Sequence, residues 1–231
     1  MELVEVKNLN KSFDKKEILK DVNFTIPSGK IIGLLGKNGA GKTTIIKLLN
    51  DLLTPTSGEI LINGNKIGVE TKKVVSYLPE RTYLNKQMKV SEVIDYFKDF
   101  YDNFDDKKAK KLLKDLDLDI NQRLSKMSKG MQEKVQLVLV MSRNADLYIL
   151  DEPLGGVDPA TRDYILDTIL SNFNENASVI ISTHLISDIE RILDEVIFID
   201  KGKIILQSDA DTIRNKEKSS IDEIFRRMFK C

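Results

Sequence analysis

The chain has 231 residues with 36 basic and 36 acidic side chains, so it can form one domain with a sizeable core, and its neutral charge does not point to nucleic acid. Hydrophobic residues make up 41% and charged residues 31%, as in soluble globular proteins, and the single cysteine, Cys231, excludes an intrachain disulfide framework and fits a reducing cytosol. The N-terminus lacks the apolar core of a signal peptide and no stretch approaches the roughly 18 apolar residues of a membrane span, so we expect a protein that does not cross a membrane by itself.

The first third of the sequence predicts strands and one helix. Apolar and polar residues alternate over Val22–Ile26, the period of a half-buried strand, and a turn follows at 27–29. Ile31–Leu35 is nearly all apolar, as expected for a strand buried on both faces. Apolar residues at helical spacing then predict a helix over Thr44–Leu53, and Glu59–Ile62 reads as a short strand.

The middle of the chain has a different character. From Ser91 to Leu118 the sequence is rich in lysine and aspartate and predicts helix, with apolar residues on one face. A second helix is expected to begin after Ser128 and to run to about Ser142. We therefore expect a helical subdomain, over about 83–145, inserted between strands.

The last third alternates strands and helices again. Buried strands are expected at Leu147–Leu150, Val179–Ser182 and Val196–Ile199. Asp158 followed by proline is a favourable helix start, and a tail of about 207–231 ends in a short amphipathic helix over 219–230. Alternating strands and helices predict an α/β fold with a parallel sheet covered on both faces.

A glycine-rich loop carries the most specific motif. Residues 36–43, with the sequence GKNGAGKT, fit the pattern G-x-x-x-x-G-K-[ST] at every fixed position, between a buried strand and an amphipathic helix. Glycines let the backbone curl around a triphosphate, and amide groups at a helix N-terminus bind the anion. Lys42 is expected to reach the β- and γ-phosphates, and the Thr43 hydroxyl to ligate Mg²⁺. The predicted nucleotide-binding residues here are Gly36, Asn38, Gly39, Ala40, Gly41, Lys42, Thr43 and Thr44.

A pair of acidic residues ends the buried strand at 147–150. In a parallel sheet, ligands bind at the carboxyl ends of the strands. We expect Asp151 to hold Mg²⁺, directly or through water, and Glu152 to act as the general base for the attacking water. The alternative is a pair of solvated charges at the end of a strand, but the phosphate-binding loop elsewhere in the chain disfavours it.

The only histidine, His184, follows the expected strand Val179–Ser182 by two residues. This position also lies at a strand's carboxyl end, where a hydrogen bond from the imidazole could sense the γ-phosphate. The alternative is a histidine in a surface loop without a role in the site.

Together these elements resemble the nucleotide-binding domain of ABC transporters over nearly the whole chain. Met127-Ser128-Lys129-Gly130-Met131 stands at the place of that family's LSGGQ signature. In the family, two domains pair head-to-tail, and each signature closes over ATP held by the other domain. The resemblance therefore implies that Ser128 and Gly130 contact the partner's ATP; a serine that merely caps a helix is the alternative.

The signature departs from LSGGQ at three of its five positions, and this version is similar to that of many bacterial export-type ABC ATPases. Other positions are also similar to the family. Phe13 falls where the family has an aromatic residue that stacks on adenine, the alternative being a core phenylalanine. Asp158 resembles the D-loop aspartate, which acts across the dimer. Glu80 stands where the family usually has a glutamine, and its carboxylate could ligate Mg²⁺ or a water bound to it.

The resemblance implies an ATP-hydrolysing subunit with a RecA-like core, an antiparallel β subdomain and a helical subdomain. Its expected cofactors are ATP and Mg²⁺. Its expected partners are a second ATPase copy, in a homodimer or heterodimer, and membrane-spanning permease subunits that hold it at the cytoplasmic face of the cell membrane. Export is favoured over import as the direction of transport. The alternative is a soluble repair- or translation-type ABC ATPase, although the sequence shows neither a long coiled coil nor two fused ATPase domains. A different phosphate-loop enzyme, such as a kinase, does not explain the signature.

Overall fold

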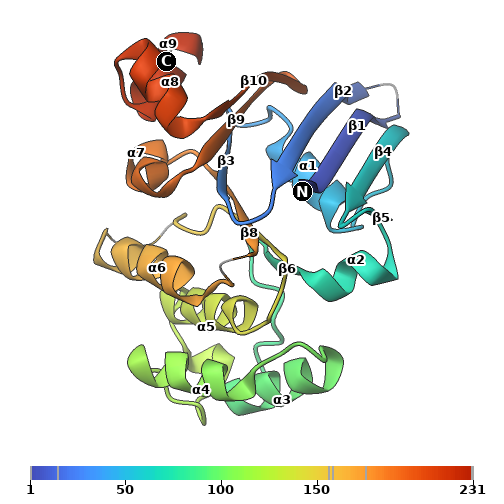
Figure 1. The fold of residues 1–231 in the computed structure, drawn as a ribbon. Helices are drawn as coiled ribbons and strands as arrows, with labels where there is room; N and C mark the ends of the chain where they lie inside the picture. The colour runs from blue at the N-terminus through green and yellow to red at the C-terminus, as the bar shows by residue number, and fades with distance from the viewer. Residues whose placement is uncertain (1, 15, 156, 158, 175, 230–231) are drawn as a thin grey trace.

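The computed structural model describes residues 2–14, 16–155, 157, 159–174 and 176–229. The strands form two sheets in the upper part of the view in Figure 1, and a layer of helices lies below them. A six-stranded sheet has the order β10-β9-β3-β8-β7-β6, in which only β10 runs antiparallel to its neighbour. Its strands are β3 (Ile31–Leu35), β6 (Val75–Leu78), β7 (Leu147–Asp151), β8 (Ser178–Thr183), β9 (Glu195–Asp200) and β10 (Lys203–Asp209).

The second sheet is antiparallel, with the order β2-β1-β4-β5. Its strands are β1 (Glu2–Phe13), β2 (Lys16–Pro27), β4 (Ser57–Ile62) and β5 (Asn65–Lys66). The mixed α/β class with an additional antiparallel sheet is the one that the sequence predicted. The helices are α1 (Lys42–Leu49), α2 (Val69–Val74), α3 (Val90–Phe100), α4 (Asp106–Asp115), α5 (Lys129–Met141), α6 (Pro159–Asn172), α7 (Ile186–Ile189), α8 (Ala210–Glu217) and α9 (Ile221–Phe229).

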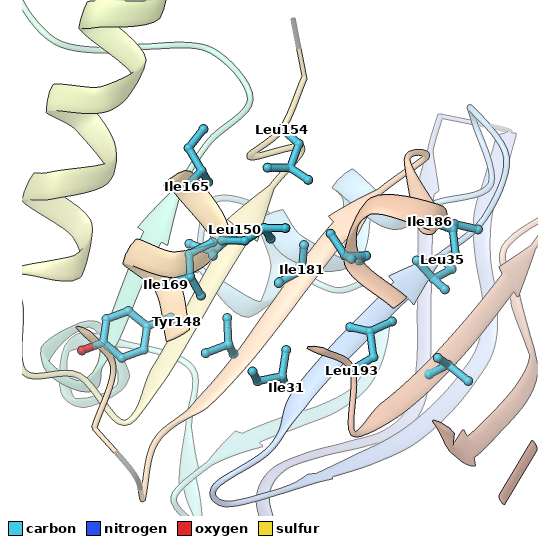
Figure 2. Close-up of a cluster of buried hydrophobic side chains, with 14 of the residues drawn as sticks. Ile31, Leu35, Tyr148, Leu150, Leu154, Ile165, Ile169, Ile181, Ile186 and Leu193 are labelled. Carbon is cyan, nitrogen blue, oxygen red and sulfur yellow. The ribbon is translucent and has the colours of Figure 1, made fainter. Parts of the chain in front are cut away.

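The central strands β3, β7 and β8 are buried along their whole length because both faces of the parallel sheet are covered. In β3, Ile31 and Leu35 belong to one cluster of buried side chains, together with residues of α6 such as Ile165 and Ile169 (Figure 2). Ile32 and Leu34 point to the other face and pack in a second cluster with α1. A strand that is buried on both faces holds its carboxyl end in a fixed position, and the candidate site is built on these ends.

The expected continuous helix over Ser91–Leu118 is wrong, because α3 ends at Phe100 and α4 begins at Asp106. Asn103 lies in the break, and its side-chain amide donates to the carbonyl of Lys73 at 2.9 Å and to that of Asn144 at 2.8 Å. The Asp105 carboxylate accepts from the Lys108 amide at 2.9 Å and caps α4. The single helix predicted from the sequence periodicity is thus divided in two by contacts to residues distant in sequence and by a local N-terminal cap.

Two other helical predictions differ from the structure. The first helix ends at Leu49, earlier than expected, because Asp51 adopts a left-handed φ of 56° and the side chain of Asn50 donates to the Ile46 carbonyl at 2.8 Å. The tail holds two helices, and α8, capped by Asp209, was not predicted. The predicted helix start at Asp158 lies outside the described residues.

Helices α3, α4 and α5 share a hydrophobic cluster of their own, at the end of the molecule opposite to α8 and α9 (Figure 1). The buried members include Ile94, Phe97, Leu112 and Val138. No helix among the described residues combines the length and the hydropathy that a membrane span requires.

Candidate nucleotide-binding site

The glycine-rich loop connects β3 to α1, and neighbouring strands press against it. A β-carbon on Gly36 would come within 2.5 Å of the Ile199 carbonyl oxygen, and one on Gly41 within 2.8 Å of the Leu19 side chain. Gly39 has a φ of +79° and Gly41 a φ of +118°, in the range that favours glycine. A side chain at Gly36 or Gly41 would therefore require the neighbouring residues to shift, and one at Gly39 would strain the backbone.

Lys42 is the first residue of α1, and its side chain folds back into the loop. Its Nζ atom donates to the Gly36 carbonyl at 2.7 Å and to the Lys37 carbonyl at 3.5 Å. Burial lowers the pKa of this ammonium group, while the negative charges of Glu152 and Asp151 act in the opposite direction. The loop thus holds a desolvated cation beside two acids, an arrangement suited to an anionic phosphate.

The acid pair lies at the carboxyl end of β7, as the sequence predicted. Asp151 is 2% exposed and pairs in register with Ser182 of β8, whose hydroxyl donates to Asp151 Oδ1 at 2.5 Å. Burial raises the pKa of the Asp151 carboxyl in spite of that hydrogen bond, and the nearby charges of Glu152 and Glu80 add to the shift. A cation bound beside this buried carboxyl would stabilise its charged form and so oppose the rise in its pKa.

Glu152 adopts a left-handed φ of 51°, and its amide donates to the Ser182 carbonyl at 2.9 Å. Its Oε2 atom accepts from the Thr183 hydroxyl at 3.2 Å and lies 2.9 Å from Nδ1 of His184. The structure therefore brings His184 against the acid predicted to be the general base, and it does not leave the imidazole without a contact in a surface loop.

One cavity of about 570 Å³ unites most of the predicted residues. Its lining includes Phe13, Asn38, Gly39, Gly41, Lys42, Thr43, Thr44, Glu80, Glu152 and His184. Asp151 lines a smaller cavity that shares Glu80 and Glu152 with the first. Gly36 and Ala40 are buried in the loop, where the Ala40 carbonyl accepts from the Gly202 amide at 2.9 Å.

Phe13 stands at the end of β1 and is not a core residue. Its side chain is 45% exposed, and the Lys11 amine lies 4.8 Å from the ring centroid. An exposed aromatic ring at the mouth of the cavity offers a surface for a planar base.

The residues predicted to bind magnesium supply oxygen atoms, as this ion prefers. Thr43 offers a hydroxyl, while Asp151 and Glu80 offer carboxylates, and the Ser182 hydrogen bond orients Asp151. Within the described ranges no three His, Cys, Asp or Glu side chains gather into a metal site. This donor set fits Mg²⁺, which commonly takes one or two protein carboxylates and completes its shell with phosphate and water.

The signature residues lie at the start of α5. Ser128 caps this helix by accepting from the Met131 amide at 3.2 Å, and a β-carbon on Gly130 would meet nothing within 4 Å. Neither residue lines the cavity around the phosphate loop, so the structure does not bring them to the loop of the same chain. Asp158 lies outside the described residues.

Sequence reasoning missed the hydroxyls that support the acid pair. Ser182 and Thr183 contact Asp151 and Glu152 because β7 and β8 are neighbours in register. Aligning the carboxyl ends of the two expected strands would have placed them side by side. No local signal predicted that the Lys37 amine, in the loop, reaches the Phe229 carbonyl at 2.6 Å.

Comparison with known proteins agrees with this geometry. The family described as ABC transporter matches residues 19–155. The lantibiotic transport ATP-binding protein SrtF of Streptococcus pyogenes is 32% identical, over 94% of this chain and 95% of its own. The SkfA peptide export ATP-binding protein SkfE of Bacillus subtilis is 32% identical, over 89% of this chain and 88% of its own.

The fold agrees as well. A solved structure described as the ATP-binding subunit of an ABC transporter superposes with a TM-score of 0.90, at 29% identity, over 98% of this chain and 99% of the other. The family match covers the phosphate loop and the acid pair, and the structural match covers the remainder. By sequence, by fold and by site, the chain belongs to the ABC transporter family as an ATP-binding subunit and an ABC-type ATP hydrolase.

Proposed function

We propose that the chain powers an ABC exporter, closing a head-to-tail dimer around ATP and reopening it on hydrolysis. The observation that carries this proposal is the division of the site into two parts. The loop, the acid pair and His184 gather around one cavity, whereas Ser128 and Gly130 lie outside it. The space that surrounds Gly130 leaves room for a second molecule. A second ATPase copy, identical or different, would complete each site.

In this proposal the loop amides and Lys42 hold the triphosphate, and Phe13 stacks on the base. Thr43, Asp151 and Glu80 hold Mg²⁺, which neutralises phosphate charge when it is bound. Glu152 accepts the proton of the attacking water while His184 and Thr183 keep its carboxylate in place. Ser128, Gly130 and Asp158 act from the partner copy.

A groove beside the helical layer supports a permease partner. It has a volume of about 530 Å³, and its lining includes Leu52, Tyr83, Phe97, Phe100 and Tyr101. Phe100 is 65% exposed, and both Leu52 and Tyr83 are 56% exposed. All its charged lining residues are cations: Lys72 is already paired with Asp51 at 2.6 Å, and Arg143 is buried and donates to main-chain carbonyls. The two remaining cations of the lining are Lys47 and Arg81. We therefore infer that it receives an apolar permease segment that carries acidic residues.

This groove favours a transporter over a soluble repair- or translation-type ATPase. By binding permease subunits, the groove would hold the chain at the cytoplasmic face of the membrane. The whole of 1–231 would form one ATPase domain. Within that domain, about 83–145 would form a helical subdomain and about 207–231 a tail. The helical subdomain forms one side of the groove and would move together with the permease during the ATP cycle. Export is favoured by the SKGM signature and by relatives named for lantibiotic transport and peptide export.

Phe100→Asp tests the groove, with Val69→Asp as its matched control because Val69 is 72% exposed and does not line the groove. Tagged chains are purified from detergent-solubilised membranes of the source cells. We expect a multispanning membrane protein to co-purify with the wild type and the control and to be lost with Phe100→Asp, while ATPase activity of the isolated chain is retained. Equal recovery with both variants would contradict the docking proposal.

A further inference from the structure

A hydrogen bond joins the phosphate loop to the far end of the chain. The Nζ atom of Lys37, the second residue of the loop, donates to the main-chain carbonyl of Phe229 at 2.6 Å. Phe229 is the last residue of α9, which lies with α8 beside β9 and β10 (Figure 1). Residues 192 positions apart therefore meet at the nucleotide loop.

The contact is favourable on electrostatic grounds. The last carbonyls of a helix have no partner within the helix and carry partial negative charge, so an ammonium group stabilises them. The helix itself is held by packing: Phe229 is 7% exposed and stacks on Phe225 with ring centroids 4.2 Å apart. Both rings contact Phe198, and this residue pairs with Leu35, directly before the loop.

The main chain of Lys37 takes part in the loop's own hydrogen bonds. Its carbonyl accepts from the Ala40 amide at 3.0 Å and from Lys42 Nζ at 3.5 Å. The side chain of Lys37 is thus fixed on α9 while its carbonyl helps to hold the lysine that meets the phosphates.

We propose that Lys37 is a positioning residue and that α9 acts as a clasp, holding the loop in the curl that receives ATP. ATP binding and the docking of α9 are then coupled, and each strengthens the other by the same factor. This inference rests on the assignment of residues 36–43 as the ATP loop. It gives the C-terminal helix a role in nucleotide affinity, although α9 contributes no side chain to the cavity around that loop.

The test compares Lys37→Met with Lys37→Arg, and takes Lys111→Met, an exposed lysine on α4, as the control. Removing the cation should raise KM for ATP by about two- to fivefold with kcat unchanged, the effect of a charge at a helix end. Arginine should restore most of the affinity, because its guanidinium can donate to the same carbonyl. The control should match the wild type.

Hydrogen exchange supplies the structural readout. In the nucleotide-free protein, amides of 221–229 should exchange faster in Lys37→Met than in the wild type. A non-hydrolysable ATP analogue should slow their exchange in the wild type and in the control, and should do so much less in Lys37→Met. Unchanged exchange in Lys37→Met would overturn the clasp whether KM or kcat changes, because Lys37, which lines the cavity, would then act on the nucleotide directly.

Lys42→Ala separates this inference from the site assignment. If Lys42→Ala abolishes ATP binding and Lys37→Met leaves KM unchanged, the clasp is wrong and the ATP site stands. If Lys42→Ala binds ATP normally, the loop assignment fails first.

Discussion

Nδ1 of His184 lies 2.9 Å from Oε2 of Glu152, and the Thr183 hydroxyl donates to the same oxygen. Both contacts therefore converge on one side of the carboxylate. In the proposed mechanism, the other oxygen, Oε1, would therefore accept the proton of the attacking water. We expect His184 to promote hydrolysis mainly by orienting Glu152 and less by contacting the phosphate.

Replacement of His184 tests this orientation. His184→Ala should lower kcat by about 10- to 100-fold, less than the loss of the base itself, while ATP affinity changes little. His184→Gln should retain more activity because its amide can still donate to Glu152. Steady-state hydrolysis with measured ATP binding checks both, and Ser187→Ala, three residues further on in α7, serves as the control. A kcat within about twofold of wild type for His184→Ala would remove His184 from the mechanism.

Gly130 allows a test of the dimer contact with little cost to the fold. Its β-carbon position is open and lies in a helix, where a non-glycine residue is intrinsically favoured by up to about 1 kcal/mol. Gly130→Arg should therefore change the melting temperature little, because its charge at the start of α5 opposes the helix dipole and offsets part of that gain, while it blocks ATP-driven dimerisation and hydrolysis. Normal dimerisation by this variant, measured by light scattering, would contradict the trans contact.

Asp151 makes a prediction about stability and pH. Because burial raises its pKa, the folded chain holds this proton more tightly than the unfolded chain, so ionisation costs stability at neutral pH. Asp151→Asn should therefore raise the melting temperature of the nucleotide-free protein at pH 7 while abolishing hydrolysis. A gain of about 1 kcal/mol would raise the melting temperature by about 2–4 °C in a chain of this size.

The difference should shrink as the pH falls through the raised pKa of Asp151 towards the unfolded-chain value of about 3.9, because the carboxyl is then protonated in the folded chain and its ionisation no longer costs stability. Asp99→Asn, on the surface of α3, is the matched control and should show no such dependence. A melting temperature for Asp151→Asn that lies below wild type at pH 7 would show that the charge stabilises the empty site.

Much of the central fold could be predicted because its strands are short and apolar. Ile31–Leu35 and Leu147–Asp151 are recognisable as strands buried on both faces, and the signals do not depend on distant residues. The division between α3 and α4 could not be predicted, since it depends on Asn103 reaching the carbonyls of Lys73 and Asn144. Contacts of that kind exist only after the chain has folded.

The site follows the same rule. The loop and the acid pair are contiguous in sequence, so their spacing predicts them, and chain order placed His184 at the right sheet edge. Ser182 and Thr183 depend on the register between β7 and β8, which the sequence leaves open. The bond from Lys37 to Phe229 depends on where the tail packs, and no local pattern encodes that position.

In the proposed cycle, ATP closes a dimer and hydrolysis by Glu152 reopens it. The most direct measurement is the mass of Glu152→Gln by size-exclusion chromatography with light scattering, in Mg-ATP and in Mg-ADP, with Lys42→Ala in the same background as control. We expect twice the 26.3 kDa chain mass in ATP and a single chain mass in ADP, with no shift for the control and turnover lowered by about 100-fold or more. A monomer in ATP, or hydrolysis at the wild-type rate, would contradict the proposed cycle.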